Sequence, residues 1–452
     1  MSNEMLPSYL KSASPNPADK RSPWYKNTAP SYAGIFLSVP FMAGMAGALQ
    51  YGSVRAAVVG LFLGALFCFV LYYVPAMLGL RTGMPLYVVG SSTFGTHGGI
   101  LMPGLLMGVL QIGWHAVFTF FAAKFFVAAI GADIAVNTPV FWVICAVWGL
   151  LLALVGAVGI GWLGWLSSWL PIFPLLMIIV AGLSNMGGLS KFGADAPVTT
   201  GGMAIPLLGL AAFMALQTTA GFFATAGAAG ADFAMNSRDR KDVVLGGFVG
   251  ITLAALVVGI FAFITIAGAI GKNPAIAAMA VSGQFEASLK EVGGTVSKVM
   301  FWVFVIASIC PTGFCAFLAA NAFSTMFPKL PRVGLTLVAG AIGVSLAATG
   351  KAENLIGFFL IIGASFGPII GAMTADYLRN GKWAGPRQGV NWAGYIAWAI
   401  GFAVGILGAI PAIGFAYGLE TLMSFLVGLA VYLILAELGF EPAVVELSPS
   451  QG

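Results

Sequence analysis

The stretch Ala56-Ala-Val-Val-Gly-Leu-Phe-Leu-Gly-Ala-Leu-Phe-Cys-Phe-Val-Leu-Tyr-Tyr-Val-Pro-Ala-Met-Leu-Gly-Leu80 runs for 25 residues without a charged side chain. A helix needs roughly 20 apolar residues to cross the hydrocarbon core of a bilayer, so this run is long enough to span it. The run is continuously apolar, whereas the strands of a membrane β-barrel alternate between apolar and polar residues. The stretch therefore predicts a transmembrane helix.

The whole chain has the same composition. Of its 452 residues, 60% are hydrophobic and 8% are charged, against roughly 25% charged in an ordinary soluble domain. So few charges argue against a soluble enzyme, a nucleic-acid-binding protein and a disordered chain. The net charge of +5 is small and scattered, which gives no reason to expect a nucleic-acid partner. The composition predicts an integral membrane protein embedded in the lipid bilayer.

Apolar runs along the chain predict an all-α fold with twelve transmembrane helices. The expected spans are approximately 33–51, 56–80, 99–130, 139–158, 160–183, 204–230, 244–271, 297–325, 333–349, 354–376, 392–410 and 412–436. The tails at 1–32 and 437–452 are expected in the cytoplasm, because this orientation places 13 basic residues in inner segments and 6 in outer loops.

Two of the expected spans contain helix-breaking residues. The first, from Gly34 to Gly47, includes Pro40, and the sixth, from Gln217 to Gly230, is rich in glycine. Interrupted spans five apart are typical of a five-plus-five inverted repeat with a binding site at the midplane. Glycine and proline are also common in membrane helices generally, so this pattern alone leaves both interpretations open.

Polar residues inside the spans are candidate site residues, because a membrane disfavours them. In the third span, Gln111, Trp114, His115 and Phe118 have the spacing of one helix face, which suits stacking on a flat polar ligand. The alternative is that Gln111 and His115 hold helices together. In the sixth span, Phe222 and Phe223 are expected at the glycine-rich break, as a second stacking wall or as ordinary packing. Gln217 is a polar partner or a helix contact.

Ser308 and Thr312 lie four residues apart in the eighth span. Their hydroxyls, together with a carbonyl freed by Pro311, could supply the oxygen ligands that Na⁺ prefers. Hydroxyls in membrane helices more often bond to the carbonyl four residues earlier, so this alternative stays open.

Carboxylates are expected at the helix ends and outside the pocket. Asp232 and Asp376 end the sixth and tenth spans, where we expect pairing with Arg238, Arg240 or Arg379. A pocket without acidic residues favours a neutral, flat substrate. The chain contains no HExxH, GxSxG or Walker motif, so no enzymatic activity, metal cofactor or ATP-driven transport is expected.

Several short motifs resemble those of the first nucleobase–cation symporter family, which includes the bacterial cytosine permeases. They lie in order between about residues 30 and 410, and they are Arg81-Thr-Gly83, Thr93-Phe-Gly95, Gly108-Val-Leu-Gln-Ile-Gly-Trp114, Ala231-Asp-Phe233, Ala375-Asp-Tyr377 and Val390-Asn-Trp392. The resemblance implies a LeuT-like fold with inverted repeats at 33–183 and 204–376 and two additional helices at 392–436. We also expect a carrier of the plasma (inner) membrane, with no obligatory protein partner.

The resemblance also implies residue roles. Gln111 and Trp114 match residues that bind and stack the base, and Phe223 matches the opposing aromatic residue. The family's cation site maps to the carbonyls of Gly34 and Leu37, and to the side chains at Ser308, Pro311 and Thr312. Two positions depart from the family pattern. Phe222 replaces a small polar residue, and Pro311 lacks a hydroxyl, so that Na⁺, a proton linked to His115, or no ion at all could be coupled.

The predicted function is import of a nucleobase (cytosine or purine-like) or related planar heterocycle, coupled to Na⁺ or H⁺ by alternating access. The alternatives are a non-coupled channel, a nutrient receptor on the same scaffold, or a carrier of a hydantoin or vitamin precursor.

Overall fold

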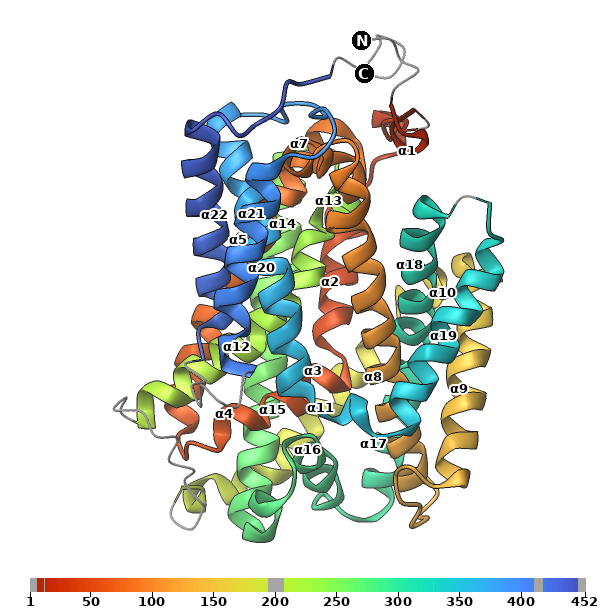
Figure 1. Ribbon diagram of the computed structural model, residues 1–452. Coiled ribbons are helices and arrows are strands. Elements are labelled where there is room, and N and C mark those ends of the chain that lie inside the picture. Colours follow the sequence, from red (N-terminus) through yellow and green to blue (C-terminus); the bar gives the residue numbers. More distant parts are fainter. Residues whose placement is uncertain (1–5, 12, 194–206, 328, 410–417, 446–452) are drawn as a thin grey trace.

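The computed structural model describes residues 6–11, 13–193, 207–327, 329–409 and 418–445 (Figure 1). Within these ranges the regular elements are helices, and the β pairing is confined to two isolated bridges, Ser22 with Ser237 and Arg387 with Val444. The α-helices are α1 (Ser8–Lys11), α2 (Thr28–Phe36), α3 (Val39–Gly44), α4 (Ala46–Leu49), α5 (Val54–Thr82), α6 (Leu86–Val89), α7 (Ser91–Phe94), α8 (Leu106–Ala129), α9 (Pro139–Val158), α10 (Ile160–Ser167), α11 (Ile172–Asn185), α12 (Leu207–Ala228), α13 (Gly230–Ala234), α14 (Arg240–Gly247), α15 (Ala254–Lys272), α16 (Val281–Lys290), α17 (Gly294–Ala307), α18 (Ile309–Met326), α19 (Arg332–Ala348), α20 (Leu355–Asn380), α21 (Trp392–Ile406) and α22 (Glu420–Glu437).

Nine helices in the described ranges are long and apolar enough to cross a membrane. A tenth candidate is the pair Thr28–Phe36 and Val39–Leu49, which bends by 50° at Leu37 and Ser38. The interruption expected in the first span is therefore confirmed. The apolar helices α19 and α21 are shorter, at 17 and 15 residues. The expected starts of the sixth span (204) and twelfth span (412), and parts of both tails, lie outside the described residues.

The interruption of the sixth span lies later than the sequence predicts. Helix α12 runs without a break through Phe222 and Phe223 to Ala228, and the break falls at Ala229, before α13. The expectation that the two phenylalanines lie in a glycine-rich break is therefore wrong. Gly221 serves close packing instead, because a Cβ there would lie 2.5 Å from the carbonyl oxygen of Phe359.

The centre of the fold is the contact between α5 and α12–α13. A Cβ at Gly60 would lie 1.9 Å from the carbonyl oxygen of Ala212, and one at Gly79 would lie 2.2 Å from that of Ala231. The two backbones therefore touch directly, as small residues permit in membrane helices. Helix α5 begins where Ser53 caps the amide of Ala56 and ends at Gly83, whose φ of 68° suits glycine.

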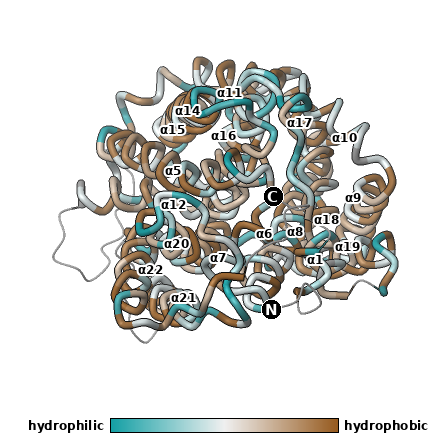
Figure 2. The backbone as a smooth tube through the Cα atoms, turned by 90° about the horizontal axis from the view of Figure 1, so that it is seen from above, coloured by the Kyte–Doolittle hydropathy of each residue, from teal (hydrophilic) through white to brown (hydrophobic). Residues whose placement is uncertain are grey.

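Helices α20 and α22 pack against α12. Helices α9, α10, α18 and α19 lie on one side, and α20, α21 and α22 lie on the opposite side, in both the side view and the view from above (Figures 1 and 2). Large apolar side chains are exposed at regular intervals on the outer helices, as at Val143, Val147, Leu151 and Val158 of α9. Such an apolar rim is expected of a protein whose surface faces lipid.

Candidate functional site

A cavity of about 760 Å³ lies among α2–α3, α8, α10–α13 and α17–α18. Its volume falls in the range of roughly 300–1,000 Å³ that small-molecule sites occupy. One part of its wall, called here the aromatic end, consists of Gln111, Trp114, Phe118 and Phe222. Another part, called here the polar end, consists of Tyr9, Asn27, Tyr87, Asp232 and Asn236.

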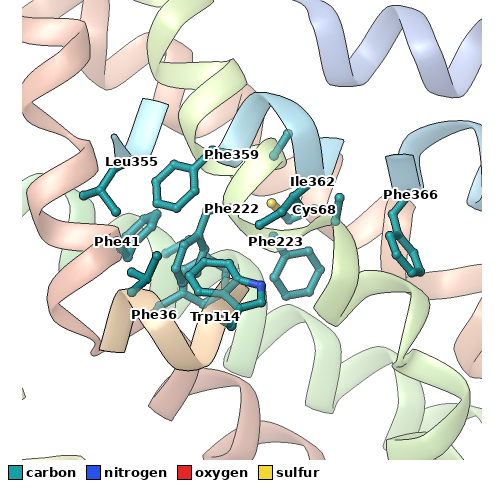
Figure 3. Packing of buried hydrophobic residues seen from close by; sticks show 14 of the residues in the cluster. Phe36, Phe41, Cys68, Trp114, Phe222, Phe223, Leu355, Phe359, Ile362 and Phe366 are labelled. Carbon is teal, nitrogen blue, oxygen red and sulfur yellow. The ribbon is translucent and has the colours of Figure 1, made fainter. Parts of the chain in front are cut away.

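Trp114 is the largest side chain of the aromatic end, and Figure 3 shows it beside Phe222. Its Nε1 donates a hydrogen bond to Thr225 Oγ1 at 3.2 Å, which joins α8 to α12 and fixes the indole. Phe222 meets the indole edge-on, with ring centroids 5.2 Å apart, and Phe118 stacks on it at 5.7 Å. The arrangement gives a rigid aromatic surface on which a flat ring could lie.

The structure places Phe222, rather than Phe223, on the cavity wall. Phe223 is fully buried, stacks on Phe36 at 5.4 Å with an interplanar angle of 11°, and tilts against Tyr32. Consecutive residues of a helix point about 100° apart, so α12 can present only one of the two rings to the cavity. Of the two phenylalanines, the one that meets Trp114 on the cavity wall is therefore Phe222, the residue that departs from the pattern of the family that the sequence resembles.

The two candidate glutamines have different surroundings. Gln111 lines the cavity, and its only hydrogen bond within the described residues is a weak donation from Nε2 to Met107 Sδ at 3.5 Å. Its amide is therefore available to a ligand. Gln217 does not line the cavity, and its Oε1 accepts a hydrogen bond from the amide of Thr421 at 2.8 Å. Gln217 therefore joins α12 to α22, which is the helix-contact role that the sequence left open.

His115 lies beside the cavity and not on its wall. The ring is fully buried, and Nδ1 donates to the carbonyl oxygen of Thr312 at 2.9 Å. Gly343 of α19 makes room for the ring, because a Cβ there would lie 2.5 Å from the imidazole Cδ2. His115 joins α8 to α18, so the structure does not bring it together with Gln111, Trp114 and Phe118.

The candidate cation-binding residues are only partly brought together. Gly34, Leu37 and Ser308 line the cavity, whereas Thr312 is fully buried and does not. The Ser308 hydroxyl donates to the carbonyl of Val305 and the Thr312 hydroxyl donates to that of Ser308, each at 2.7 Å. Both hydroxyls therefore bond to backbone of their own span, and Thr312 does so four residues earlier, which is the alternative that the sequence left open. Within the described residues, no group of three or more His, Cys, Asp or Glu could hold a metal.

The ion pairs differ from those expected. Asp376 pairs with Arg387 at 2.9 Å and accepts from Thr93 Oγ1 at 3.1 Å, whereas Arg379 pairs with Glu437. The prediction that Asp376 pairs with an arginine close to it in sequence is therefore wrong. After α20 the chain turns back, and this turn places Arg387 beside Asp376. This buried pair joins α20 to α7 and the segment before α21.

Asp232 is the second correction. Arg238 pairs with Asp242 at 2.7 Å, and Asp232 has no ion-pair partner within the described residues. Asp232 lines the polar end of the cavity, so the expectation of a pocket without acidic residues is wrong. The sequence did contain a signal for this, since Phe222, Thr225, Ala229, Asp232 and Phe233 recur near helical spacing and all line the cavity.

Two native cysteines provide a test of the cavity. Cys310 and Cys315 line it, whereas Cys68 and Cys145 do not. We expect methyl methanethiosulfonate to modify the first pair about tenfold faster or more, since reaction requires access to the thiol. Mass spectrometry of the purified protein, with Cys310→Ser and Cys315→Ser variants as controls, measures the rates. Equal rates at all four thiols would contradict the assignment of the cavity.

The structure is that of an all-helical membrane protein with a cavity of the size that small-molecule sites occupy. The family model described as "Permease for cytosine/purines, uracil, thiamine, allantoin" matches residues 15–428, and the chain belongs to this family. It is therefore a transport protein and not an enzyme. Cytosine permeases of Escherichia coli strain K12 and of Escherichia coli O157:H7 are each 27% identical over 340 residues, which cover 73% of this chain and 73% of each relative.

Solved structures share the fold. Mhp1, a nucleobase-cation-symport-1 family transporter, matches in a closed conformation with bromovinylhydantoin bound (TM-score 0.69, 16% identity, 94% of both chains). Its inward-facing conformation matches with a TM-score of 0.70 and 17% identity over 96% of this chain and 95% of that one. A Na⁺-coupled sialic acid symporter in an outward-open state matches with a TM-score of 0.62 and 13% identity over 93% and 90%.

Proposed function

We propose that this transporter imports a nucleobase, cytosine or purine-like, or a related planar heterocycle, coupled to Na⁺ or H⁺ by alternating access. The observation that carries the proposal is the aromatic end of the cavity, where Trp114 and Phe222 offer stacking surface beside the free amide of Gln111. The names of the relatives, cytosine permeases, support this substrate class. The hydantoin derivative bound to Mhp1 supports a related heterocycle equally.

In the proposed binding mode, the ring lies on Trp114, Phe222 contacts its edge or face, and Gln111 reads its hydrogen-bonding groups. Phe223 supports the site from behind through Phe36. Stacking of a base on an aromatic side chain contributes about 1–3 kcal/mol, by analogy with nucleic-acid platforms. A side-chain amide can both donate and accept hydrogen bonds, which suits a heterocycle that carries donors and acceptors.

The proposed topology has twelve crossings, made of the nine long helices, the bent pair, and α19 and α21. Inverted repeats at 33–183 and 204–376, with two further helices at 392–436 and both tails in the cytoplasm, complete the proposal. The likeness to Mhp1 and the distribution of basic residues support it. In this orientation the polar end of the cavity faces the cytoplasm, and the location is the plasma (inner) membrane.

A direct test uses the purified chain in proteoliposomes. A thermal-shift screen of heterocycles first finds a ligand, because binding to the folded state raises the apparent stability. Counterflow of that labelled ligand then separates the alternatives. Saturable exchange supports a carrier, a linear non-saturable flux would indicate a channel, and binding without flux would indicate a receptor.

Coupling predicts that a cation gradient drives accumulation of the ligand. We expect accumulation above the external concentration with an inward Na⁺ gradient at constant pH, or with an inward proton gradient in choline chloride. If Na⁺ is the ion, Ser308→Ala is expected to raise the Na⁺ concentration for half-maximal uptake about tenfold, since Ser308 lines the cavity and the change removes an oxygen ligand. Ser345→Ala, an exposed serine of α19, is the matched control. Uptake that is unchanged by both the Na⁺ gradient and the proton gradient would contradict the proposed ion coupling.

A further inference from the structure

We propose that residues 6–11, called here the lid, cover the polar end of the cavity, and that Tyr9 holds the lid closed and thereby limits exchange of the cavity with the cytoplasm. This role goes beyond the proposed function. It rests on that function in one respect, the orientation in which the polar end of the cavity faces the cytoplasm.

The lid is packed onto the helices, although it lies in the segment 1–32 that the sequence predicts as a cytoplasmic tail. Leu6, Tyr9 and Leu10 are each at most 7% exposed and belong to the main hydrophobic core. Helix α1, which contains Tyr9 and Leu10, lies at the same end of the bundle as α7 and α13 (Figure 1) and next to α8 in the view from above (Figure 2). A solvated tail would leave these apolar side chains in water, so the lid has a defined docking position.

Tyr9 makes the contact between the lid and the rim of the cavity. Its hydroxyl donates a hydrogen bond to the carbonyl oxygen of Thr96 at 2.8 Å, and its ring meets that of Tyr87 on α6 edge-on, with centroids 6.0 Å apart. Gly99 leaves room for the phenol, because a Cβ there would lie 3.1 Å from the Tyr9 hydroxyl. Both tyrosines line the cavity. Part of the cavity wall is therefore supplied by a segment that precedes the first span.

The residues between the lid and α2 are anchored to the ends of α5 and α13. The amide of Asn16 donates to the carbonyl oxygen of Gly83, and its side-chain Nδ2 donates to Asn236 Oδ1, each at 2.8 Å. Arg21 Nη1 donates to the carbonyl oxygen of Leu80 at 3.0 Å. These contacts do not involve the lid, so that the lid stays tethered beside the cavity when the contacts of Tyr9 are broken.

The position of the lid places it on the route of a substrate. In the proposed orientation, a ring that leaves Trp114 for the cytoplasm passes the polar end last, and Tyr9 lies there. A short element with few buried side chains can open locally while the long helices stay folded. Opening of the lid therefore requires only the loss of the Tyr9 hydrogen bond and of the burial of its apolar side chains.

Two native cysteines report the opening of the lid, because Cys310 and Cys315 line the cavity behind it. The reagent is 2-sulfonatoethyl methanethiosulfonate, whose charge keeps it in water and out of the detergent belt. Its reaction follows the population of the open lid, so Tyr9→Ala is expected to raise the rate at both thiols about tenfold. Tyr9→Phe keeps the ring, loses only the hydrogen bond and should raise the rate about threefold. Tyr25→Ala, which changes a tyrosine that is 59% exposed in the same segment, is the matched control and should change nothing.

The two other cysteines distinguish an open lid from a loosened fold. Cys68 and Cys145 do not line the cavity, so their rates should stay constant in every variant. Unchanged rates at Cys310 and Cys315 in Tyr9→Ala would overturn the lid, and so would faster reaction at all four thiols. If Tyr9→Ala does not fold, Tyr9→Phe decides the question in the same way.

A second measurement tests the effect of the lid on transport. In proteoliposomes, Tyr9→Ala is expected to speed exchange of the labelled ligand from the thermal-shift screen about threefold or more, since the closed lid delays release. Exchange at the wild-type rate would overturn the lid as a limit on transport. The thiol measurement needs no ligand. If no heterocycle binds the wild type, the proposed function fails, and the thiol rates still decide whether the lid exists.

Discussion

Replacing Trp114 with alanine is expected to abolish measurable uptake by the protein that folds. The indole is the centre of the aromatic end, so its removal deletes both the stacking surface and the hydrogen bond to Thr225 Oγ1. Loss of one aromatic stack weakens base binding by about 1–3 kcal/mol, and a ring that is no longer oriented is not carried efficiently. The ring is buried and packs against four phenylalanines, so the variant should also be less stable, and uptake is compared per amount of folded protein.

Two variants control this experiment. Trp114→Phe keeps an aromatic face and should retain partial uptake, and Trp302→Ala removes an indole that is 41% exposed on α17 and should retain full uptake. Uptake is measured in proteoliposomes and the folded yield by size-exclusion chromatography. Full transport by Trp114→Ala would remove Trp114 from the site.

The second large effect is expected at Gly60. A valine there would place its Cβ 1.9 Å from the carbonyl oxygen of Ala212, and no side-chain rotation relieves a collision with backbone. The contact between α5 and α12 would have to open along its length. Overpacking of a core usually lowers the free energy of unfolding by about 1–3 kcal/mol. A Cβ that collides with a backbone carbonyl is expected to cost at least the upper end of that range.

The expected result is loss of most of the folded protein and a lower apparent melting temperature in detergent. Gly161→Val is the matched control, because a Cβ at Gly161 of α10 meets nothing within 4 Å. If Gly60→Val unfolds at the same temperature as Gly161→Val, the direct backbone contact between α5 and α12 would be contradicted.

The fold was largely predictable because a long run of apolar residues is enough to identify a membrane span. Runs such as 56–80 and 139–158 became α5 and α9 with boundaries within two residues, since bilayer thickness sets helix length directly. The kink of the first span also followed from local sequence, since it lies at Leu37 and Ser38, just before Pro40. The break of the sixth span did not, because Gly221 serves packing against Phe359 and the chain bends at Ala229 instead.

The site was predictable only to the level of a helix face. Spacing placed Gln111, Trp114 and Phe118 together, but the rotation of α8 that excludes His115 depends on Gly343 of a distant helix. Likewise, the sequence could not tell which of Phe222 and Phe223 lines the cavity, because this depends on the position of Phe36, which stacks on Phe223. The open charge of Asp232 could not be foreseen, since it depends on which arginines the tertiary structure directs elsewhere.

The backbone contact between α5 and α12–α13 has a mechanical consequence. With bare backbone at Gly60 and Gly79, neither helix can slide past the other without driving one chain into the carbonyl oxygens of its neighbour. The two helices should therefore move as one rigid pillar. In the proposed alternating-access cycle, the rocking that opens the cavity to each side in turn is then left to Leu37, Ala229 and Ser308, where the regular helices are interrupted. Changes in mobility are therefore expected at these three interruptions and not within the pair of α5 and α12.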